Sequence, residues 1–317
     1  MLLQPFLAAL LVYHRLTWQV APALAAAVLV FLVRDPLTVL ARQKWVWRGE
    51  RPETAAARRY LAVESILLAL CGATLAIAWP LRILAVLGGA AGALTILAVY
   101  MTVHNRQRAV WLQALSAAGL SSSALAACLA ISPAVPAWGW WIWALHAAHF
   151  LGGILVVHVR LDARIALRKP GAELKAGFLR MRREAALVQV SFAIAAVALL
   201  ARGFWFYGAA LAGSAVFHLL DLYRLHSEQA LLLPMKSVGK RALTASIAFT
   251  LLVVAGSLQA ASARPIPRRA ADGTIRLACL RDNAESSNPG SSFAIRREWR
   301  EWACREADRL PRDARQR

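Results

Sequence analysis

Long apolar blocks recur along this chain, and they constrain its fold more than any other feature. An α-helix needs about 20 apolar residues to cross a hydrocarbon core of about 30 Å, and these blocks run for roughly 15 to 23 residues with few charges. Hydrophobic residues make up 59% of the 317 residues and charged ones only 17%, with a mean hydropathy of +0.50. These values exclude a soluble globular enzyme.

Hydropathy predicts an all-α membrane protein, a polytopic bundle of about nine transmembrane helices with a disordered C-terminal tail. The apolar segments are 2–13, 18–33, 60–79, 83–101, 109–132, 138–158, 187–201, 203–220 and 243–261. The first is short, because a helix over residues 2–13 rises only about 18 Å. It therefore indicates either a re-entrant segment or a start codon that lies upstream. We expect a transmembrane domain over 1–262 and an Arg-rich tail over 263–317.

The basic residues alternate between the two sides of this predicted bundle. The net charge is +20. The stretches 34–59, 106–108, 160–183 and 224–241 together hold 21 Lys and Arg, whereas the intervening connections hold three. Translocation of Lys and Arg across a membrane is unfavourable. This bias predicts a multi-pass protein of the bacterial cytoplasmic (inner) membrane, with a cytoplasmic N-terminus and cytoplasmic basic stretches.

The same distribution bears on the partners of the protein. Positive charge spread between apolar blocks orients a membrane protein, so we expect no nucleic-acid binding. Basic stretches that contain Trp45 and Trp47 fit the surface of an anionic cytoplasmic leaflet. In the tail, 13 Arg and no Lys occur among polar and small residues, which is typical of disorder. With nine spans the tail lies outside, although its charge favours the inside, so its side stays open.

Polar residues inside or beside the apolar segments are the candidates for a binding site. His218 and Asp221 are three residues apart and share a helical face, and Asp221 and Arg224 have the spacing of an ion pair. His149 and His218 offer a haem two axial ligands from different helices, although histidines in bundles more often bond to neighbouring hydroxyls. We expect no cofactor, no metal and no catalytic residue. The ligand-binding candidates are Arg34, Asp35, His104, Asn105, Arg106, His149, His218, Asp221 and Arg224.

Small residues gather at several places within the apolar segments. Gly88 and Gly92 have the GxxxG spacing, Gly152 and Gly153 are adjacent, and Gly119 precedes a serine run. Small side chains let helices approach closely. We therefore expect all three patches to pack within the bundle.

Several strings resemble the bacterial YwiC-like membrane protein family. The resemblance covers roughly residues 1–260 and excludes the tail. Members of the family usually carry a His-Gly-Ala-Trp-type stretch just before the segment that corresponds to residues 1–6. It implies a multi-span inner-membrane protein without an established reaction. The strings are Met1–Phe6, Arg34–Leu37, His104–Arg108, Leu151–Leu155 with Val159 and Arg160, and Gly239–Leu243 with Ser246, Phe249 and Thr250.

Two classes of function remain open on the sequence alone. The first is binding or transport of a small molecule or lipid. The alternative is a membrane enzyme that acts on lipid-linked or prenyl substrates. Prenyl transfer requires paired carboxylate clusters that hold Mg²⁺ against a diphosphate, whereas Asp35, Asp162 and Asp221 each stand without such a cluster. We therefore favour a protein that is not an enzyme.

Overall fold

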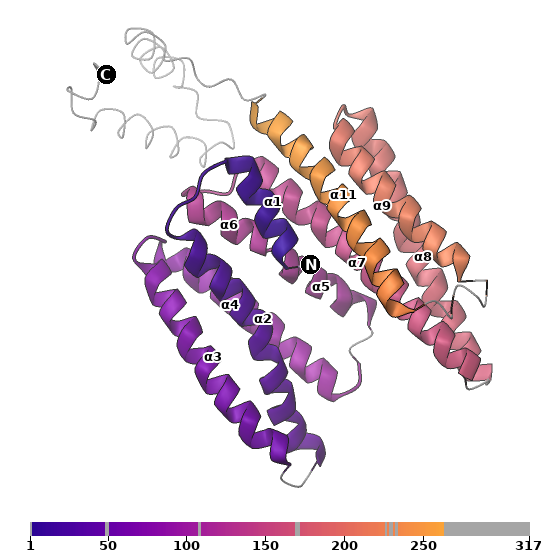
Figure 1. The fold of residues 1–317 in the computed structure, drawn as a ribbon, viewed down its shortest axis with the longest axis horizontal. Coiled ribbons are helices and arrows are strands. Elements are labelled where there is room, and N and C mark those ends of the chain that lie inside the picture. The colour runs from indigo at the N-terminus through magenta and orange to yellow at the C-terminus, as the bar shows by residue number, and fades with distance from the viewer. Residues whose placement is uncertain are drawn as a thin grey trace, which may run out of the picture. The chain divides into compact units, whose positions relative to one another are not determined.

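The computed structural model describes residues 2–47, 51–106, 109–168, 172–225, 227, 231 and 234–262. In these ranges every regular element is a helix (Figure 1). The helices are α1 (Leu3–Tyr13), α2 (Val20–Arg42) with a π-helical turn (Gln43–Trp47), α3 (Pro52–Ala76), α4 (Leu81–Val103), α5 (Val110–Ser121), α6 (Ser123–Ile131), α7 (Ala137–Arg168), α8 (Ala172–Ala201), α9 (Trp205–Arg224) and α11 (Met235–Ser262). The predicted disordered tail, 263–317, lies outside the described residues.

All nine apolar segments are helical, and the predicted all-α membrane fold is confirmed. Eight helical stretches in the described part are long and apolar enough to cross a membrane. One of them, Val110–Ile131, comprises both α5 and α6. The two helices meet at Ser122, whose hydroxyl donates to the carbonyl of Gly119 at 2.6 Å. The first segment forms only α1, an apolar helix of 11 residues.

Several helices continue well beyond the apolar segments. α2 runs to Arg42, α7 runs to Arg168, and α8 already begins at Ala172. Much of the basic sequence that hydropathy assigns to connecting loops is therefore helical. The reason is physical: hydropathy reports where a helix leaves the hydrocarbon, whereas backbone hydrogen bonding continues as long as the residues favour a helix.

Successive helices place the four basic stretches at one end of the bundle, which we call the basic end. At this end Arg164 Nε donates to the carbonyl of Leu231 at 2.8 Å, and Arg241 pairs with Asp221. Among the described residues, the basic end comprises the C-terminal ends of α2, α4, α7 and α9 and the N-terminal ends of α3, α5, α8 and α11.

Different connections meet at the opposite end of the bundle. There the Trp79 indole donates to Gln19 Oε1 at 3.2 Å, and the Thr17 hydroxyl donates to the carbonyl of Ala130 at 2.5 Å. These contacts join the connection after α1 to the connection after α3 and to the last turn of α6. The connections rich in Lys and Arg therefore lie at one end of the bundle, and the connections poor in them lie at the other.

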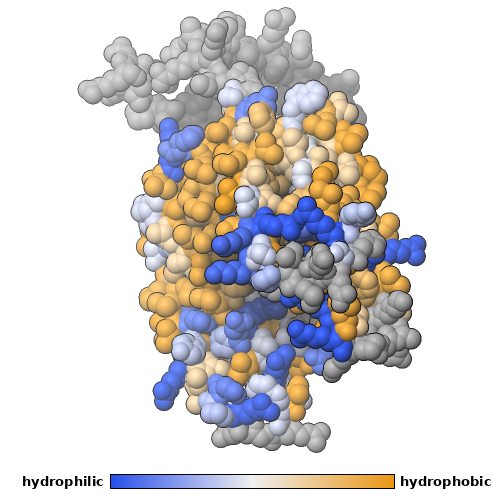
Figure 2. Space-filling model, turned by 45° about the vertical axis from the view of Figure 1, so that its right-hand side comes forward, coloured by the Kyte–Doolittle hydropathy of each residue, from blue (hydrophilic) through white to orange (hydrophobic). Residues whose placement is uncertain are grey.

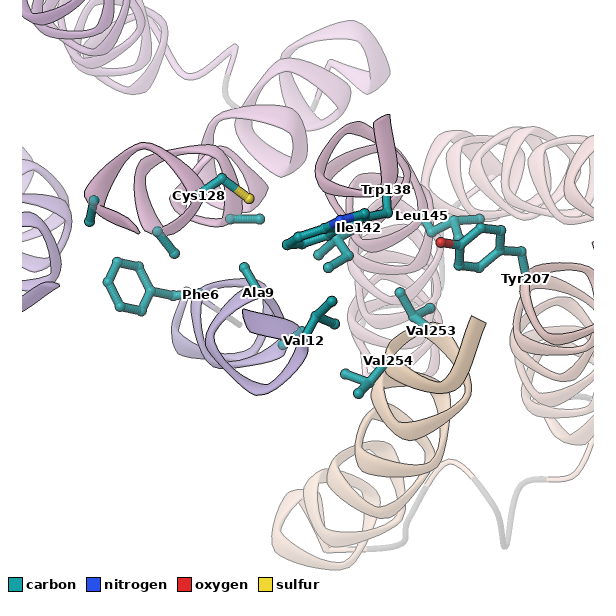
Figure 3. Packing of buried hydrophobic residues seen from close by; sticks show 14 of the residues in the cluster. Phe6, Ala9, Val12, Cys128, Trp138, Ile142, Leu145, Tyr207, Val253 and Val254 are labelled. Carbon is teal, nitrogen blue, oxygen red and sulfur yellow. The ribbon is translucent and has the colours of Figure 1, made fainter. Parts of the chain in front are cut away.

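Helix α7 is the central element of the bundle. It contacts α1, α5, α6, α8, α9 and α11. Figure 3 shows how α1 places Phe6 and Val12 in an apolar cluster with Ile142 of α7 and Val253 of α11. Trp138 is 6% exposed and stands edge-on to Tyr13 in this cluster.

The outer helices leave broad apolar faces uncovered by the other described helices. Only 6% of the residues in the most apolar stretch of α3 are buried, whereas 50% are buried in the corresponding stretches of α7 and α9. Figure 2 shows hydrophobic side chains over most of one face, with hydrophilic ones gathered mainly in its lower half. Such a surface requires a hydrocarbon environment, because exposing it to water is unfavourable.

Candidate binding site in the membrane-spanning bundle

Polar side chains from four helices face one another in the interior of the bundle. The helices α7, α8, α9 and α11 pack together, and their shared interior is polar although the segments are apolar overall. Buried polar groups are expensive in a membrane and mark candidate sites of function. We call this set the polar core, and it consists of His146, His149, Gln189, Ser214, His218, Ser246 and Thr250.

His149 is fixed at the centre of the polar core. Its Nδ1 lies 2.7 Å from the hydroxyl of Ser214 on α9, and its Nε2 lies 2.9 Å from the hydroxyl of Ser246 on α11. The ring also stacks on Phe249, with centroids 4.3 Å apart. Because both ring nitrogens are engaged by serines, His149 offers no free nitrogen to a haem iron in this arrangement.

His146 lies one helical turn before His149 and is similarly fixed. Its Nδ1 donates to the carbonyl of Ile142 at 2.9 Å, and its Nε2 lies 3.3 Å from the hydroxyl of Thr250. The side chain has no exposure to solvent. This histidine joins α7 to α11 and satisfies its own hydrogen-bonding groups.

His218 and Gln189 differ from the other members of the polar core, because their polar atoms are unsatisfied. His218 is 5% exposed and Gln189 is fully buried. Neither ring nitrogen of His218 nor either amide atom of Gln189 makes a hydrogen bond to any described residue. Most buried polar groups in native proteins do have a partner. These four atoms are the least satisfied part of the polar core, although the backbone of His149 lies within reach of the His218 ring.

Gly152 is the point at which these two side chains meet. A Cβ atom built on Gly152 would lie 2.7 Å from Gln189 Nε2 and 3.1 Å from His218 Cδ2. On Gly153 it would lie 3.5 Å from His218 Cε1, which is an ordinary contact. The absence of a side chain at Gly152 therefore allows Gln189 of α8 and His218 of α9 to converge on α7.

Charged groups lie beside the polar core toward the basic end. Asp221 is one helical turn beyond His218 on α9, and its Oδ1 accepts a hydrogen bond from Arg241 of α11 at 2.8 Å. The partner expected from spacing, Arg224, is exposed at the end of α9. Asp221 therefore ties α9 to α11 through a residue 20 positions away.

The other predicted site residues lie apart from the polar core. Arg34 of α2 places a guanidinium nitrogen 3.5 Å from the hydroxyl of Thr102 on α4, and the adjacent Asp35 is exposed. His104, Asn105 and Arg106 form the exposed end of α4, where Asn105 has a left-handed backbone with φ of 57°. The nine candidates therefore divide between two places.

A cavity of about 390 Å³ connects α2 with α7 near Arg34. Its polar lining comes from Gln113 and Ser116 of α5 and from His158 of α7. The cavity brings Arg34 to α7 but not to the polar core. Arg34 of α2 thus shares a cavity with residues of α5 and α7. The spacing of these residues in the sequence did not predict this.

Sequence reasoning found His149, His218 and Asp221 but missed three participants. Gln189 carries a visible signal, because it is a polar residue inside the apolar run 187–201. Arg160 and Arg241 appeared in the sequence as charges of basic stretches and within the strings of the family resemblance, not as site residues. Nothing in their spacing distinguishes them from the other basic residues, since their position depends on how α7, α9 and α11 pack.

The arrangement of serine and histidine in the polar core differs from that of a nucleophilic site. Serine beside histidine also occurs in nucleophilic catalysis, where a third group orients the base. Here the second nitrogen of His149 is held by another serine instead. Among the described residues, no three His, Cys, Asp or Glu side chains lie close enough together to hold a metal ion. The polar core instead offers donors and acceptors in a water-poor interior, where each hydrogen bond is strengthened.

The fold and its polar interior define a multi-pass α-helical membrane protein. Residues 1–128 match the family model described as YwiC-like protein. This similarity covers α1 to α5 and most of α6, and it agrees with the resemblance over this stretch. No curated protein and no solved structure matches the chain. The polar core lies in α7 to α11, beyond the matched residues.

Proposed function

We propose that this protein binds a small polar molecule in its polar core and carries it across the bacterial inner membrane. The observation that carries the proposal is the pair of buried, unsatisfied side chains at Gly152. A guest molecule that bonds to His218 and Gln189 removes the unfavourable free energy of leaving these groups buried without partners.

The position of the site supports transport over a purely structural role. Gly152 lies near the middle of α7, 15 residues after Ala137 and 16 before Arg168. From either surface, a ligand must pass through part of the bundle to reach a site at this depth. Secondary transporters hold their substrates at such depths, between packed helices.

The proposed orientation places the basic end and the N-terminus on the cytoplasmic side. It follows from the excess of Lys and Arg in the four basic stretches, which is the main determinant of topology in such proteins. The same residues face an anionic leaflet and are the proposed lipid partners. The small molecule then moves between the cytoplasm and the opposite face along α7, α9 and α11.

Native mass spectrometry of the full chain, released gently from membranes, tests the binding proposal. We expect a bound small molecule on the wild type and its loss from Gln189→Leu and His218→Phe. The substitution Gln113→Leu, in the separate α5 cavity, is the matched control and retains the adduct. A wild-type protein that is free of small molecules, or an adduct that all three variants keep, would contradict the proposal.

Uptake in sealed vesicles tests transport separately. Once the adduct has been identified by its mass, the labelled compound is offered to proteoliposomes that contain wild type or Gln189→Leu. We expect accumulation only with the wild type. Binding without uptake would limit the function to binding.

A further inference from the structure

Arg160 is a buried cation whose guanidinium has no hydrogen-bond or ion-pair partner among the described residues. It lies in the second half of α7 with 2% of its surface exposed and is the largest fully buried side chain in the described residues. Its guanidinium makes neither a hydrogen bond nor an ion pair with a described residue, and Nη1 is completely enclosed. Buried charges in proteins are otherwise paired or hydrogen-bonded.

The neighbouring charges do not neutralise Arg160. Asp221, Arg164 and Arg241 lie within electrostatic range of its guanidinium. Asp221 is already paired with Arg241 at 2.8 Å, and Arg164 donates to the carbonyl of Leu231. Asp221 is therefore already engaged by Arg241, and no described carboxylate forms an ion pair with Arg160.

The surroundings of these charged groups are apolar, which makes a buried charge more costly. Val156 and Val159 of α7 and Leu222 of α9 belong to the hydrophobic cluster around this part of the bundle. In such surroundings water compensates little of the charge, and an uncompensated buried ion is destabilising by several kcal/mol. An anion that approaches Arg160 removes this penalty.

We propose that Arg160 anchors an anion-binding site, and that the molecule bound by the polar core carries a carboxylate or phosphate group. The guanidinium presents paired donors whose geometry matches either group. This inference rests on the proposed function, whose ligand it assigns to a chemical class. The anionic group belongs either to a small solute or to the headgroup of an anionic lipid.

The geometry connects the anion site with the polar core. Arg160 follows Gly152 by eight residues on α7, a rise of about 12 Å toward the basic end. Asp221 and His218 are one turn apart on α9 and lie along the same interval. A ligand with its anionic group at Arg160 therefore extends its polar remainder toward His218 and Gln189.

The first experiment measures the thermal stability of purified Arg160→Met. Methionine has a similar length and no charge, so without added anion we expect a Tm equal to or above that of wild type. Arg224→Met is the matched control, since it removes the same charge from an exposed position. A large drop in Tm for Arg160→Met alone would show that the guanidinium has an internal partner, which overturns the proposal.

The second experiment adds the anions themselves. Sodium phosphate and sodium acetate are compared with sodium chloride at equal ionic strength in detergent, and nanodiscs of phosphatidylglycerol are compared with nanodiscs of phosphatidylcholine. We expect wild-type Tm to rise by about 5 °C near a hundredfold excess over Kd. Arg160→Met loses this response, and Arg160→Lys retains it at lower affinity.

The pattern of responses identifies the source of the anion. A response to free phosphate or acetate assigns a soluble ligand, whereas a response to phosphatidylglycerol alone assigns a lipid headgroup. A response that is absent, or equal in wild type and Arg160→Met, overturns the inference. If the anion response fails but native mass spectrometry still detects a bound neutral or cationic molecule, the proposed function stands without the anion site.

Glu228 provides a last control, because it is the single carboxylate in the sequence 225–234. Glu228→Gln is expected to keep the wild-type response to anions. If instead this substitution lowers Tm in the absence of anions and Arg160→Met restores it, Glu228 is the counterion of Arg160. That outcome overturns the anion site.

Discussion

At the scale of single residues, the site depends on where a side chain is missing. Gly152 allows Gln189 and His218 to meet, and the adjacent Gly153 faces only an ordinary contact. The sequence presents both glycines as one small-residue patch. Which of the two matters depends on the rotation of α7 against α8 and α9, and periodicity alone does not resolve neighbouring positions.

Gly152→Ala tests this difference directly. The new methyl group would stand 2.7 Å from Gln189 Nε2, so the amide must shift away from His218. We expect loss of the small-molecule adduct and a fall in the free energy of unfolding of about 1 kcal/mol, as in mild overpacking. We expect Gly153→Ala to keep the adduct and to change the free energy of unfolding by no more than about 0.5 kcal/mol. Native mass spectrometry and thermal unfolding measure the two effects, and equal behaviour of the two variants contradicts the assignment.

Asp221→Asn tests the charge cluster. The substitution removes the carboxylate that interacts electrostatically with Arg160 and pairs with Arg241. Since Arg241 is partly exposed, we expect a loss of about 2 kcal/mol in stability, less than for a fully buried pair. Asp35→Asn, at an exposed position on α2, leaves stability unchanged. An unchanged Tm for Asp221→Asn shows that the pair does not contribute to stability.

At the scale of helices, hydropathy predicted where the chain crosses the membrane but not which faces pack. The Gly88 and Gly92 pair was expected to pack within the bundle. A Cβ at either position has no described neighbour within 4 Å, so this expectation is wrong for the described residues. The spacing reports that close approach is possible, whereas the partner depends on which helices become neighbours. For Gly119, by contrast, a Cβ would meet Leu94 of α4 at 3.1 Å.

Packing between α9 and α11 provides an element-scale prediction at Gly256. A Cβ there would lie 2.7 Å from Tyr207 Cδ1 and Cε1. Tyr207 has little room to move, because its ring stacks on Trp141 and its hydroxyl lies 3.0 Å from Ser257 Oγ. We expect Gly256→Ala to lower the free energy of unfolding by about 2 kcal/mol.

Gly213→Ala is the control for this substitution. Gly213 also lies within a helix, but a Cβ there meets no atom within 4 Å. Alanine favours the helix over glycine by up to about 1 kcal/mol. Thermal unfolding should therefore show a lower Tm for Gly256→Ala and an equal or higher Tm for Gly213→Ala. The reverse order would mean that α9 and α11 are packed differently.

At the scale of the whole molecule, charge and packing agree on a bundle with two distinct ends. The sequence predicted the order of spans because each apolar segment is long and each basic stretch is rich in Lys and Arg. It did not predict that α7 would be the central helix. All the segments are similarly apolar, and the position of a helix in the bundle follows from contacts between segments distant in the sequence.

Cysteine labelling in intact cells tests which end faces the cytoplasm. The native cysteines are first replaced by serine, and then a single cysteine is introduced as Ser227→Cys at the basic end or Ala134→Cys at the opposite end. Both positions are exposed. A membrane-impermeant maleimide should label Ala134→Cys in cells with a permeabilised outer membrane, whereas Ser227→Cys should react only after the inner membrane is opened.

The labelling result also bears on the direction from which an anion reaches Arg160. With the basic end in the cytoplasm, Arg160 lies nearer the cytoplasmic surface than Gly152 does, and an anion enters the cluster from that side. Labelling of Ser227→Cys from outside would invert the bundle against the charge rule, which is unfavourable with 21 Lys and Arg to translocate. The anion would then meet Arg160 from the cell exterior, and the site would serve uptake at its first step.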